Sequence, residues 1–289
     1  MAHTRFEGET AIVTGGASGI GFAFGAELAA RGATVVLADR DGDAAAERAA
    51  ELDRSRKGSV RGVELDVRDE DAVRAVVVDT IDRSGAVDLL FNNAGISAGG
   101  PTHELTGEHW DRVIDVNLRG VVNGVLAAYP LMIEQGHGHI VNTASGAGLV
   151  APPFVTAYAA TKHAVVGLSL GLRPEAALHG VRVSVLCPGA VETPILDRPP
   201  EPGLPPTASA PVTAREYLAV VRQKPVPAER VARRALDGVR RNRAVIVAPP
   251  SAATLWYLHR VSPWLALRVT GMLARKVDRE LVRPNTRLR

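Results

Sequence analysis

The stretch Thr10-Ala-Ile-Val-Thr-Gly-Gly-Ala-Ser-Gly-Ile-Gly21 decides the fold that this sequence predicts. Its first five residues are apolar or β-branched, which is typical of a buried strand. The glycines that follow predict a tight loop, and an apolar helix is expected from about Ile20 to Arg31. A buried strand that turns through glycines straight into a helix is the first half of a βαβ unit.

The glycine loop also suits a bound phosphate. Glycines let the backbone approach a pyrophosphate, and the helix that follows directs N–H groups and the positive end of its dipole at it. The spacing is Gly-x-x-x-Gly-x-Gly, whereas the standard fingerprint is Gly-x-Gly-x-x-Gly, and a bare glycine loop can be a structural turn. Asp39 closes the second predicted strand, where a carboxylate accepts hydrogen bonds from ribose hydroxyls. The combination predicts dinucleotide binding.

Asp39 also bears on the choice of dinucleotide. A carboxylate at this point repels a 2′-phosphate, which favours NAD(H) and leaves NADP(H) as the alternative. Arg40 follows directly and would clamp such a phosphate if it turned inward. We interpret Arg40 as a solvated loop cation.

Strand-like runs alternate with helix-period segments along the rest of the chain. Further strands are predicted at Thr34–Ala38, Val60–Leu65, Leu89–Asn92, His139–Thr143, Arg182–Leu186 and Ala244–Val247, and long helices at Gly107–Gln135 and Thr156–His179. Strands separated by such helices imply right-handed crossovers and a parallel sheet. The predicted fold class is α/β: a Rossmann-type doubly wound parallel sheet of about seven strands with helices on both faces, plus a C-terminal helical extension.

Two segments interrupt this alternation and set the predicted boundaries. Asp197–Ala214 carries six prolines, so we expect a flap or a connection there and neither a regular helix nor a central strand. We predict a single domain over residues 1–250, with a Pro-rich substrate lid at 197–224, and a basic amphipathic extension at 251–289.

The composition, 46% hydrophobic and 22% charged, is that of an ordinary globular protein. Met1–Thr10 does not resemble a signal peptide, and the apolar stretches are too short or too interrupted to predict a membrane span. Cys187 is the only cysteine, which excludes an internal disulfide and favours a reducing, cytoplasmic setting. It lies in an apolar run, so we interpret it as a core thiol.

The charge is concentrated at one end of the chain. The net charge is +3, but eight basic side chains against two acidic ones put +6 on the residues from Arg260 onward, which leaves the preceding residues at −3. A mildly acidic body gives no support to nucleic-acid binding.

Tyr158 and Lys162 form the strongest chemical signal outside the glycine loop. A spacing of four residues puts both side chains on one helix face. An ammonium beside a phenol favours the phenolate, so the pair can move a proton near neutral pH although a free tyrosine titrates near ~10. The same spacing is common on solvated helix faces, so its meaning depends on the residues around it.

With these residues in place, the chain resembles the short-chain dehydrogenases/reductases over roughly residues 9–250. The matching features, in the family's order, are Thr14-Gly-x-x-x-Gly-x-Gly21, Asn92-Asn93-Ala94-Gly95, Asn117, Ser145, Tyr158-x-x-x-Lys162, and Pro188-Gly189 with Thr193. Each feature alone is a weak signal, but the full set in this order is very specific.

The resemblance implies a catalytic set of four residues. Tyr158 would be the general acid/base on a carbonyl or alcohol oxygen, and Lys162 would lower its pKa and hold the nicotinamide ribose. Ser145 would hydrogen-bond the substrate oxygen, and Asn117 would interrupt its helix and hold a water that links Lys162 to solvent. These roles agree with the chemistry: a hydride moves between carbon and cofactor, so the protein handles one proton and one oxyanion.

The resemblance also implies the cofactor contacts. They are Gly15, Ser18, Gly19, Ile20, Gly21, Asp39, Arg40, Asp66, Val67, Asn93, Ala94, Gly95, Tyr158, Lys162, Pro188, Gly189, Val191 and Thr193. Asp66 has an alternative role as the cap of the helix that starts near Asp69. We expect Asn92 to be structural. The histidines lack ligand spacing, so no metal site is predicted.

The loop between Ser145 and Tyr158 is almost without polar groups, and in this family's fold it borders the substrate. The predicted substrate contacts are Ser145, Val150, Pro153, Phe154 and Tyr158. We therefore expect a small apolar alcohol or ketone rather than a sugar or an acid. The alternative is that part of these apolar side chains fill the core. The Pro-rich segment stands where the family keeps its substrate lid.

The extension predicts a basic amphipathic helix with tryptophans. Its expected apolar positions are Trp256, Tyr257, Trp264, Leu265, Val269, Leu273 and Val277, with arginines on the other faces. Such a helix can lie on an anionic membrane or pack on a subunit. We favour packing within the protein or its oligomer, with peripheral membrane contact as the alternative.

The predicted function is that of an NAD(H)-preferring oxidoreductase that acts on a secondary alcohol or ketone. The alternatives are an NADP(H)-dependent carbonyl reductase and a cofactor-binding sensor or scaffold without turnover, against which the complete catalytic set argues. The resemblance implies a homodimer or homotetramer in which the helices at Gly107–Gln135 and Thr156–His179 pair across a two-fold axis.

Overall fold

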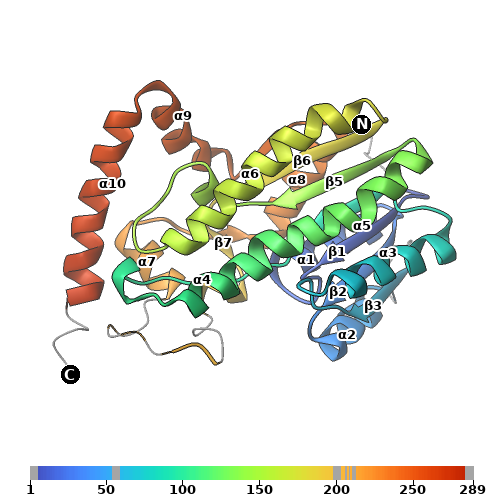
Figure 1. Cartoon of the computed structure of the whole chain (residues 1–289), viewed down its shortest axis with the longest axis horizontal. Helices are drawn as coiled ribbons and strands as arrows, with labels where there is room; N and C mark the ends of the chain where they lie inside the picture. The colour runs from blue at the N-terminus through green and yellow to red at the C-terminus, as the bar shows by residue number, and fades with distance from the viewer. Residues whose placement is uncertain are drawn as a thin grey trace.

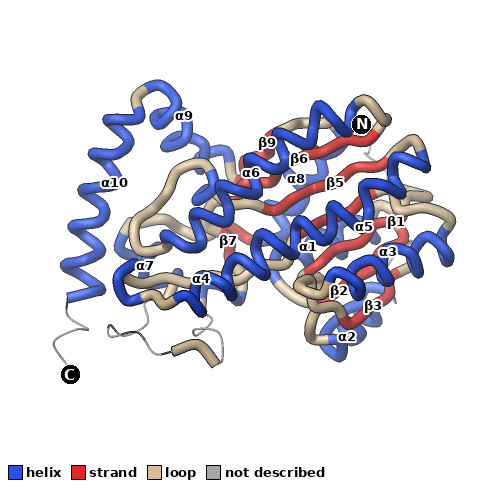
Figure 2. Tube along the Cα trace, in the orientation of Figure 1, coloured by secondary structure: helices blue, strands red, loops and turns tan. Residues whose placement is uncertain are grey.

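The computed structural model describes residues 6–53, 59–197, 203–205, 207, 209 and 213–283. Its centre is a seven-stranded parallel sheet in the order β3-β2-β1-β4-β5-β6-β9 (Figures 1 and 2). The strands are β1 (Thr10–Thr14), β2 (Thr34–Asp39), β3 (Val60–Glu64), β4 (Leu89–Asn92), β5 (Gly138–Thr143), β6 (Val181–Pro188) and β9 (Val245–Ala248). A two-stranded sheet pairs β7 (Val191–Glu192) with β8 (Val226–Pro227).

Helices cover both faces of the large sheet, which confirms the predicted α/β class. They include α1 (Gly19–Ala30), α2 (Gly42–Asp53), α3 (Glu70–Ser84), α4 (Gly107–Ile114), α5 (Gly120–Gln135), α6 (Thr156–Ala177) and α8 (Ala228–Arg240). Successive side chains of a strand point to opposite faces of the sheet, so neighbouring residues of β1 belong to the cores on its two faces. Ala11 and Val13 pack in one core with α1 and α8, and Ile12 packs in the other with α3 and α5. Strands covered on both sides are rich in apolar residues, as β1 and β4 are.

The strand order reverses between β1 and β4. From β1 the chain runs outward to β2 and β3, and it then returns to the other side of β1 to add β4, β5 and β6. The crossovers on the two sides diverge and leave a crevice at the carboxyl ends of β1 and β4, where folds of this kind bind ligands.

The helix predicted at Gly107–Gln135 consists of three parts. A π-helical segment, Asp115–Arg119, joins α4 to α5. By length and composition this stretch could cross a membrane, contrary to the sequence prediction. In the fold it lies over one face of the sheet and α5 packs against α3, so we interpret it as a core helix (Figure 1).

The Pro-rich segment is only partly described. Residues 198–202, 206, 208 and 210–212 lie outside the described residues, and so does the greater part of the predicted flap. Within the predicted lid, 197–224, a helix does form: α7 (Ala214–Val220). It begins with a capping box in which Glu216 N donates to Thr213 Oγ1 (3.2 Å) and Thr213 N donates to Glu216 Oε2 (2.8 Å).

The extension forms two helices, α9 (Ala253–Val261) and α10 (Pro263–Val277), at one end of the molecule (Figure 1). Lys276 Nζ of α10 donates to Val220 O at the end of α7 (2.5 Å), so the extension packs on the lid. The predicted apolar stripe is wrong at three positions: Tyr257, Trp264 and Leu265 are 60%, 64% and 42% exposed, whereas Ala266 is buried. The buried side of α10 is the side that faces α7.

Candidate active site

A cavity of about 1470 Å³ lies along the carboxyl edge of the sheet. Its wall includes the glycine loop and Asp39, then Tyr158 and Lys162, then α7 and α10. Every residue predicted to contact the cofactor lines this cavity except Gly21.

The glycine loop has the shape that a phosphate requires. Gly15 and Gly19 have φ values of +65° and +55°, a region that favours glycine. A Cβ at Gly21 would lie 2.1 Å from Gly15 O, so Gly21 supports the loop from behind and does not face the cavity. Helix α1 starts after Ser18, whose side chain makes no capping hydrogen bond. An anion is therefore the natural partner of the N–H groups in the first turn.

Asp39 lies at the end of β2 and holds the glycine loop in place. Its Oδ2 accepts from Ala17 N (3.1 Å) and its Oδ1 from Asp41 N (3.2 Å), while the residue also lines the cavity. This position suits both a structural role and contact with a ribose.

Asp66 lines the same end of the cavity and is paired with Arg68, a contact that the sequence did not predict. Arg68 donates to both carboxylate oxygens of Asp66, and these hydrogen bonds lower the pKa of the Asp66 carboxyl. Asp66 does not cap α3, because Asp69 is the cap and accepts from Ala72 N (3.0 Å). Arg40 is exposed and also lines the cavity.

Asn92, the last residue of β4, and Asn93, which follows it, have different roles. Asn92 is buried and donates from Nδ2 to Asn142 Oδ1 (2.9 Å), and Asn142 in turn donates to Ser169 Oγ (3.0 Å), which ties β4, β5 and α6 together. The placement agrees with the structural role expected for Asn92. Asn93 lines the cavity, but its Nδ2 donates to Thr14 O (3.0 Å). Only part of Asn93 therefore faces a ligand.

The residues of the predicted catalytic set meet where β5 ends and α6 begins. Ser145 follows β5, its Oγ accepts from Ala147 N (3.1 Å), and its side chain hydrogen-bonds Tyr158. Lys162 lies one turn further along α6, with its Nζ 5.7 Å from the centre of the Tyr158 ring. The Lys162 ammonium donates to Thr143 O (2.9 Å).

Burial controls the protonation of this pair. It raises the pKa of Tyr158, although the hydrogen bond with Ser145 lowers it, and it lowers the pKa of Lys162 to about 8. In this structure burial outweighs the hydrogen bond with Ser145, so the pKa of the Tyr158 phenol lies above its usual value. The Lys162 ammonium is directed at Thr143 O.

Asn117 is completely buried in the π-helical segment and does not line the cavity. Its side chain is paired with the backbone of Ile96: Ile96 N donates to Oδ1 (2.8 Å), and Nδ2 donates to Ile96 O (2.9 Å). A Cβ at Gly95 would lie 3.2 Å from Asn117 Oδ1 and 3.4 Å from Lys162 Nζ. Asn117 therefore stands directly behind Gly95 and next to Lys162.

At the substrate end, Val150 and Phe154 line the cavity as predicted, and Pro153 does not. Phe154 adopts φ +63°, and its carbonyl accepts from Gly100 N (2.7 Å). A bulky residue in this region is strained, so the hydrogen bond helps to hold the loop in shape.

Part of the wall comes from elements that sequence reasoning did not assign to the site. These residues are Tyr217 and Leu218 of α7, Leu255 of α9, and Thr270 and Leu273 of α10. Burial raises the pKa of the Tyr217 phenol to about 12. The wall is therefore mostly apolar and uncharged. The spacing of positions 266, 270, 273 and 277 was the available signal for the inner side of α10.

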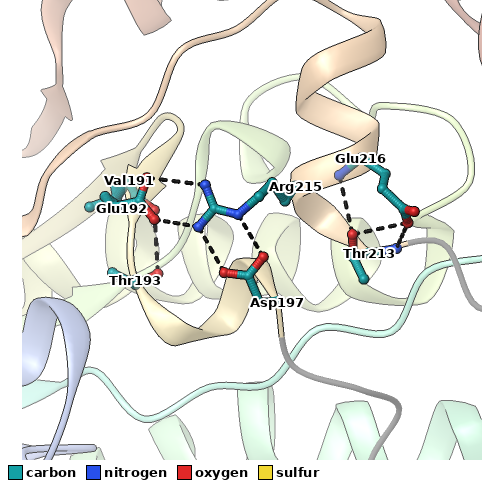
Figure 3. A network of polar contacts seen from close by, with 7 residues as sticks. All are labelled: Val191, Glu192, Thr193, Asp197, Thr213, Arg215 and Glu216. Carbon is teal, nitrogen blue, oxygen red and sulfur yellow. Dashed lines mark hydrogen bonds and ion pairs between the residues drawn. The ribbon is translucent and has the colours of Figure 1, made fainter.

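Arg215 ties α7 to the segment that follows β7 (Figure 3). Its guanidinium pairs with Glu192 of β7 and donates to both carboxylate oxygens of Asp197 (2.6 and 2.7 Å). These hydrogen bonds lower the pKa of both carboxyls. Thr193 lies between the two acids in sequence, and a Cβ at Gly19 would lie 3.1 Å from Thr193 Cγ2. Arg215 thus links the lid helix to the segment that covers the glycine loop.

The chain is similar to proteins of known sequence over its first two thirds. The family model described as short chain dehydrogenase matches residues 9–201. A levodione reductase of Leifsonia aquatica is 40% identical over 196 residues, which cover 67% of this chain and 73% of that enzyme. A 2-dehydro-3-deoxy-L-rhamnonate dehydrogenase (NAD(+)) of Sphingomonas sp. (strain SKA58) is 42% identical over 198 residues, 68% of this chain and 78% of that enzyme.

Solved structures match over a longer span. A short-chain dehydrogenase/reductase from Burkholderia phymatum in complex with NAD has a TM-score of 0.80 and 35% identity, and the match covers 90% of this chain and 96% of that one. A short-chain dehydrogenase from Sphingobium yanoikuyae in complex with NADPH has a TM-score of 0.74 and 26% identity, covering 90% and 95%.

Proposed function

The chain belongs to the short-chain dehydrogenase/reductase family, and on that premise we propose that it transfers a hydride between NAD(H) and the carbinol or carbonyl carbon of an apolar secondary alcohol or ketone. The enzyme is an oxidoreductase of alcohol or ketone substrates. The observation that carries the proposal is that Ser145, Tyr158 and Lys162 line one cavity together with the glycine loop.

The cavity fits a nicotinamide dinucleotide at its other end. The positive φ angles of Gly15 and Gly19 leave room for a pyrophosphate beside α1, and Asp39 and Asp66 are placed for the adenosine half. When bound, the nicotinamide supplies or accepts the hydride. Of the remaining predicted contacts, Val67, Ala94, Gly95, Pro188, Gly189, Val191 and Thr193 line the same wall.

The residues of this chain handle the proton and the oxygen. In alcohol oxidation the substrate O–H proton passes to the Tyr158 oxygen, and in ketone reduction Tyr158 returns it. Ser145 donates a hydrogen bond to the substrate oxygen as negative charge develops there. Lys162, protonated below about pH 8, favours the phenolate form of Tyr158. Asn117, fixed by Ile96, keeps the backbone beside Lys162 in place.

We propose NAD(H) as the preferred cofactor because Asp39 would face the 2′ position of the ribose. The specific observation that favours NADP(H) is that Arg40 lines the same end of the cavity. The NAD-bound and NADPH-bound neighbours agree with either cofactor.

The proposed substrate is a small apolar alcohol or ketone. Val150, Phe154, Leu218, Leu255 and Leu273 line the substrate end of the cavity, which supports an apolar substrate. We propose a cytoplasmic setting, which agrees with the single, buried Cys187. We propose no nucleic-acid partner.

We further propose a homodimer or homotetramer. Leu126 of α5 and Leu170 of α6 are 48% and 42% exposed, and both helices lie on one side of the sheet (Figure 1). Pairing of these helices across a two-fold axis would bury both side chains.

The test is a screen of alcohols and ketones in which NADH and NADPH absorbance are followed separately. Tyr158→Phe is expected to lower kcat about a thousandfold and to change the Kd for NADH by a much smaller factor, because the proton transfer is lost whereas the other cofactor contacts remain. Tyr129→Phe is the matched control, since Tyr129 does not line the cavity. Unchanged turnover in Tyr158→Phe would remove the catalytic assignment of Tyr158. Absence of turnover by the unchanged protein with every alcohol and ketone, together with binding of NADH, would favour a sensor or scaffold role.

A further inference from the structure

The extension exposes a concentrated apolar surface. Among the described residues, six of the ten exposed large hydrophobic side chains belong to α9 and α10. The outer face of α10 consists of Trp264, Leu267, Arg268, Gly271, Met272, Arg275 and Arg279, which together line a shallow surface groove. Trp264, Leu267 and Met272 are 64%, 67% and 59% exposed, so the fold itself does not cover them.

The opposite side of the same helix is already in use. Ala266 and Val277 are buried, and Thr270 and Leu273 line the substrate cavity. The apolar side chains of the outer face are therefore additional to those that attach the helix to the body. Solvent exposure of such a patch marks a contact surface.

The outer face is also strongly basic. The groove is lined by three arginines, Arg268, Arg275 and Arg279, and residues 253–277 contain no acidic residue. Arg268 lies over the Trp264 ring, with its Cζ 4.6 Å from the ring centre. The first acid after this stretch, Asp278, is paired with Arg283 (2.7 Å). Glu280 is the second acid, so the residues from Arg268 to Arg283 carry five Lys or Arg residues against two acidic ones, and the segment keeps a net positive charge.

We propose that the outer face of α10 binds the surface of an anionic lipid bilayer. Arginines interleaved with tryptophan, leucine and methionine suit the boundary between acidic headgroups and acyl chains. A second copy of this chain fits the face poorly, because a two-fold contact would bring Arg268 and Arg275 against their own copies without an acid between them. The site lies at the end of the molecule, away from the sheet (Figures 1 and 2).

The test is co-sedimentation of the full chain with vesicles of phosphatidylglycerol and phosphatidylcholine, and with vesicles of phosphatidylcholine alone. Binding is expected only to the anionic vesicles and is expected to weaken as salt is added. The triple variant Arg268→Gln, Arg275→Gln, Arg279→Gln should bind roughly a hundredfold more weakly. Trp264→Ser should weaken binding without any change of charge.

The matched control is Arg48→Gln, Arg74→Gln, Arg83→Gln, which removes the same charge from exposed arginines of α2 and α3. It should bind as the unchanged protein does. Failure of the protein to bind anionic vesicles, or equal loss in both triple variants, would overturn the proposal. So would a change of subunit number in the outer-face variant by light scattering, since the face would then be a contact between copies. Turnover of a soluble substrate, measured on the same proteins, tests the catalytic proposal separately.

Discussion

At the scale of single residues, the environment of each side chain decides what it can contribute. Asp39 shows this for cofactor choice, because its carboxylate both holds Ala17 and faces the cavity. Asp39→Asn removes the charge and is expected to raise the ratio of kcat/KM for NADP to kcat/KM for NAD about tenfold, which corresponds to ~1.4 kcal/mol.

The measurement is initial rates with the two cofactors at a fixed substrate concentration. Glu64→Gln, at the end of the neighbouring strand and outside the cavity wall, should leave the ratio unchanged. An unaltered ratio in Asp39→Asn would contradict the assigned preference for NAD.

His139 in β5 gives a prediction for the dependence of stability on pH. It is fully buried, its Nε2 donates to Ser184 Oγ (2.8 Å), and Ser184 in turn donates to Arg243 O (2.6 Å). Burial, with help from nearby arginines, lowers the pKa of His139 to about 3. At pH values between about 3 and the ordinary pKa of 6.5, His139 binds a proton in the unfolded chain but not in the native protein.

The free energy of unfolding should therefore fall as the pH drops below 6.5, by up to about 1.4 kcal/mol for each pH unit from this residue alone. His139→Gln keeps a donor for Ser184 and should flatten the slope of Tm against pH in this range. The exposed His179→Gln is the control. Equal slopes in the two variants would exclude His139 as the cause.

The sequence predicted which residues belong to the site better than it predicted which of them face the ligand. Gly21, Asn117 and Pro153 are next to the cavity but do not line it. Gly21 is required because Gly15 O would collide with a Cβ, and Asn117 because Ile96 needs its amide. Residue patterns do not distinguish a side chain in the wall from one that supports it.

At the scale of elements, Arg215 determines how α7 is attached. Arg215→Gln is expected to raise KM for the substrate severalfold with a smaller effect on kcat, because the lid would be less firmly linked to the segment around Thr193. Its ion pairs are exposed, so the change in the free energy of unfolding should stay within about 1 kcal/mol.

The measurements are KM and kcat from steady-state kinetics and Tm from thermal melts. The control is Arg230→Gln, which changes an exposed arginine of α8. A loss of stability without a change in KM would mean that the contact is structural only. Neither α7 nor its attachment could be predicted, since the prolines before it conceal a short helix whose partners lie in distant segments.

At the scale of the whole molecule, the nucleotide half and the substrate half differ in how far the sequence predicts them. The sheet and the glycine loop follow from local patterns, such as the strand at Thr10–Thr14, which is found as predicted. The outer wall of the cavity depends on how α10 packs against α7, and this long-range contact has no local signature.

The contribution of α10 to substrate choice can be measured with Leu273→Phe, which narrows the cavity. We expect kcat/KM for a bulky apolar alcohol to fall about tenfold relative to that for a small one. Leu265→Phe, on the exposed side of the same helix, should leave the ratio unchanged. Parallel losses for both alcohols would indicate damage to the fold.

The order in which the residues of the cavity wall occur in the sequence has a consequence for folding during translation. The glycine loop, Asp39 and the strands beside them are made first, whereas Thr270 and Leu273 are made after the whole sheet. During translation the nucleotide site can therefore form while the outer wall is still missing. We expect a nascent chain to acquire its cofactor before it can discriminate among substrates.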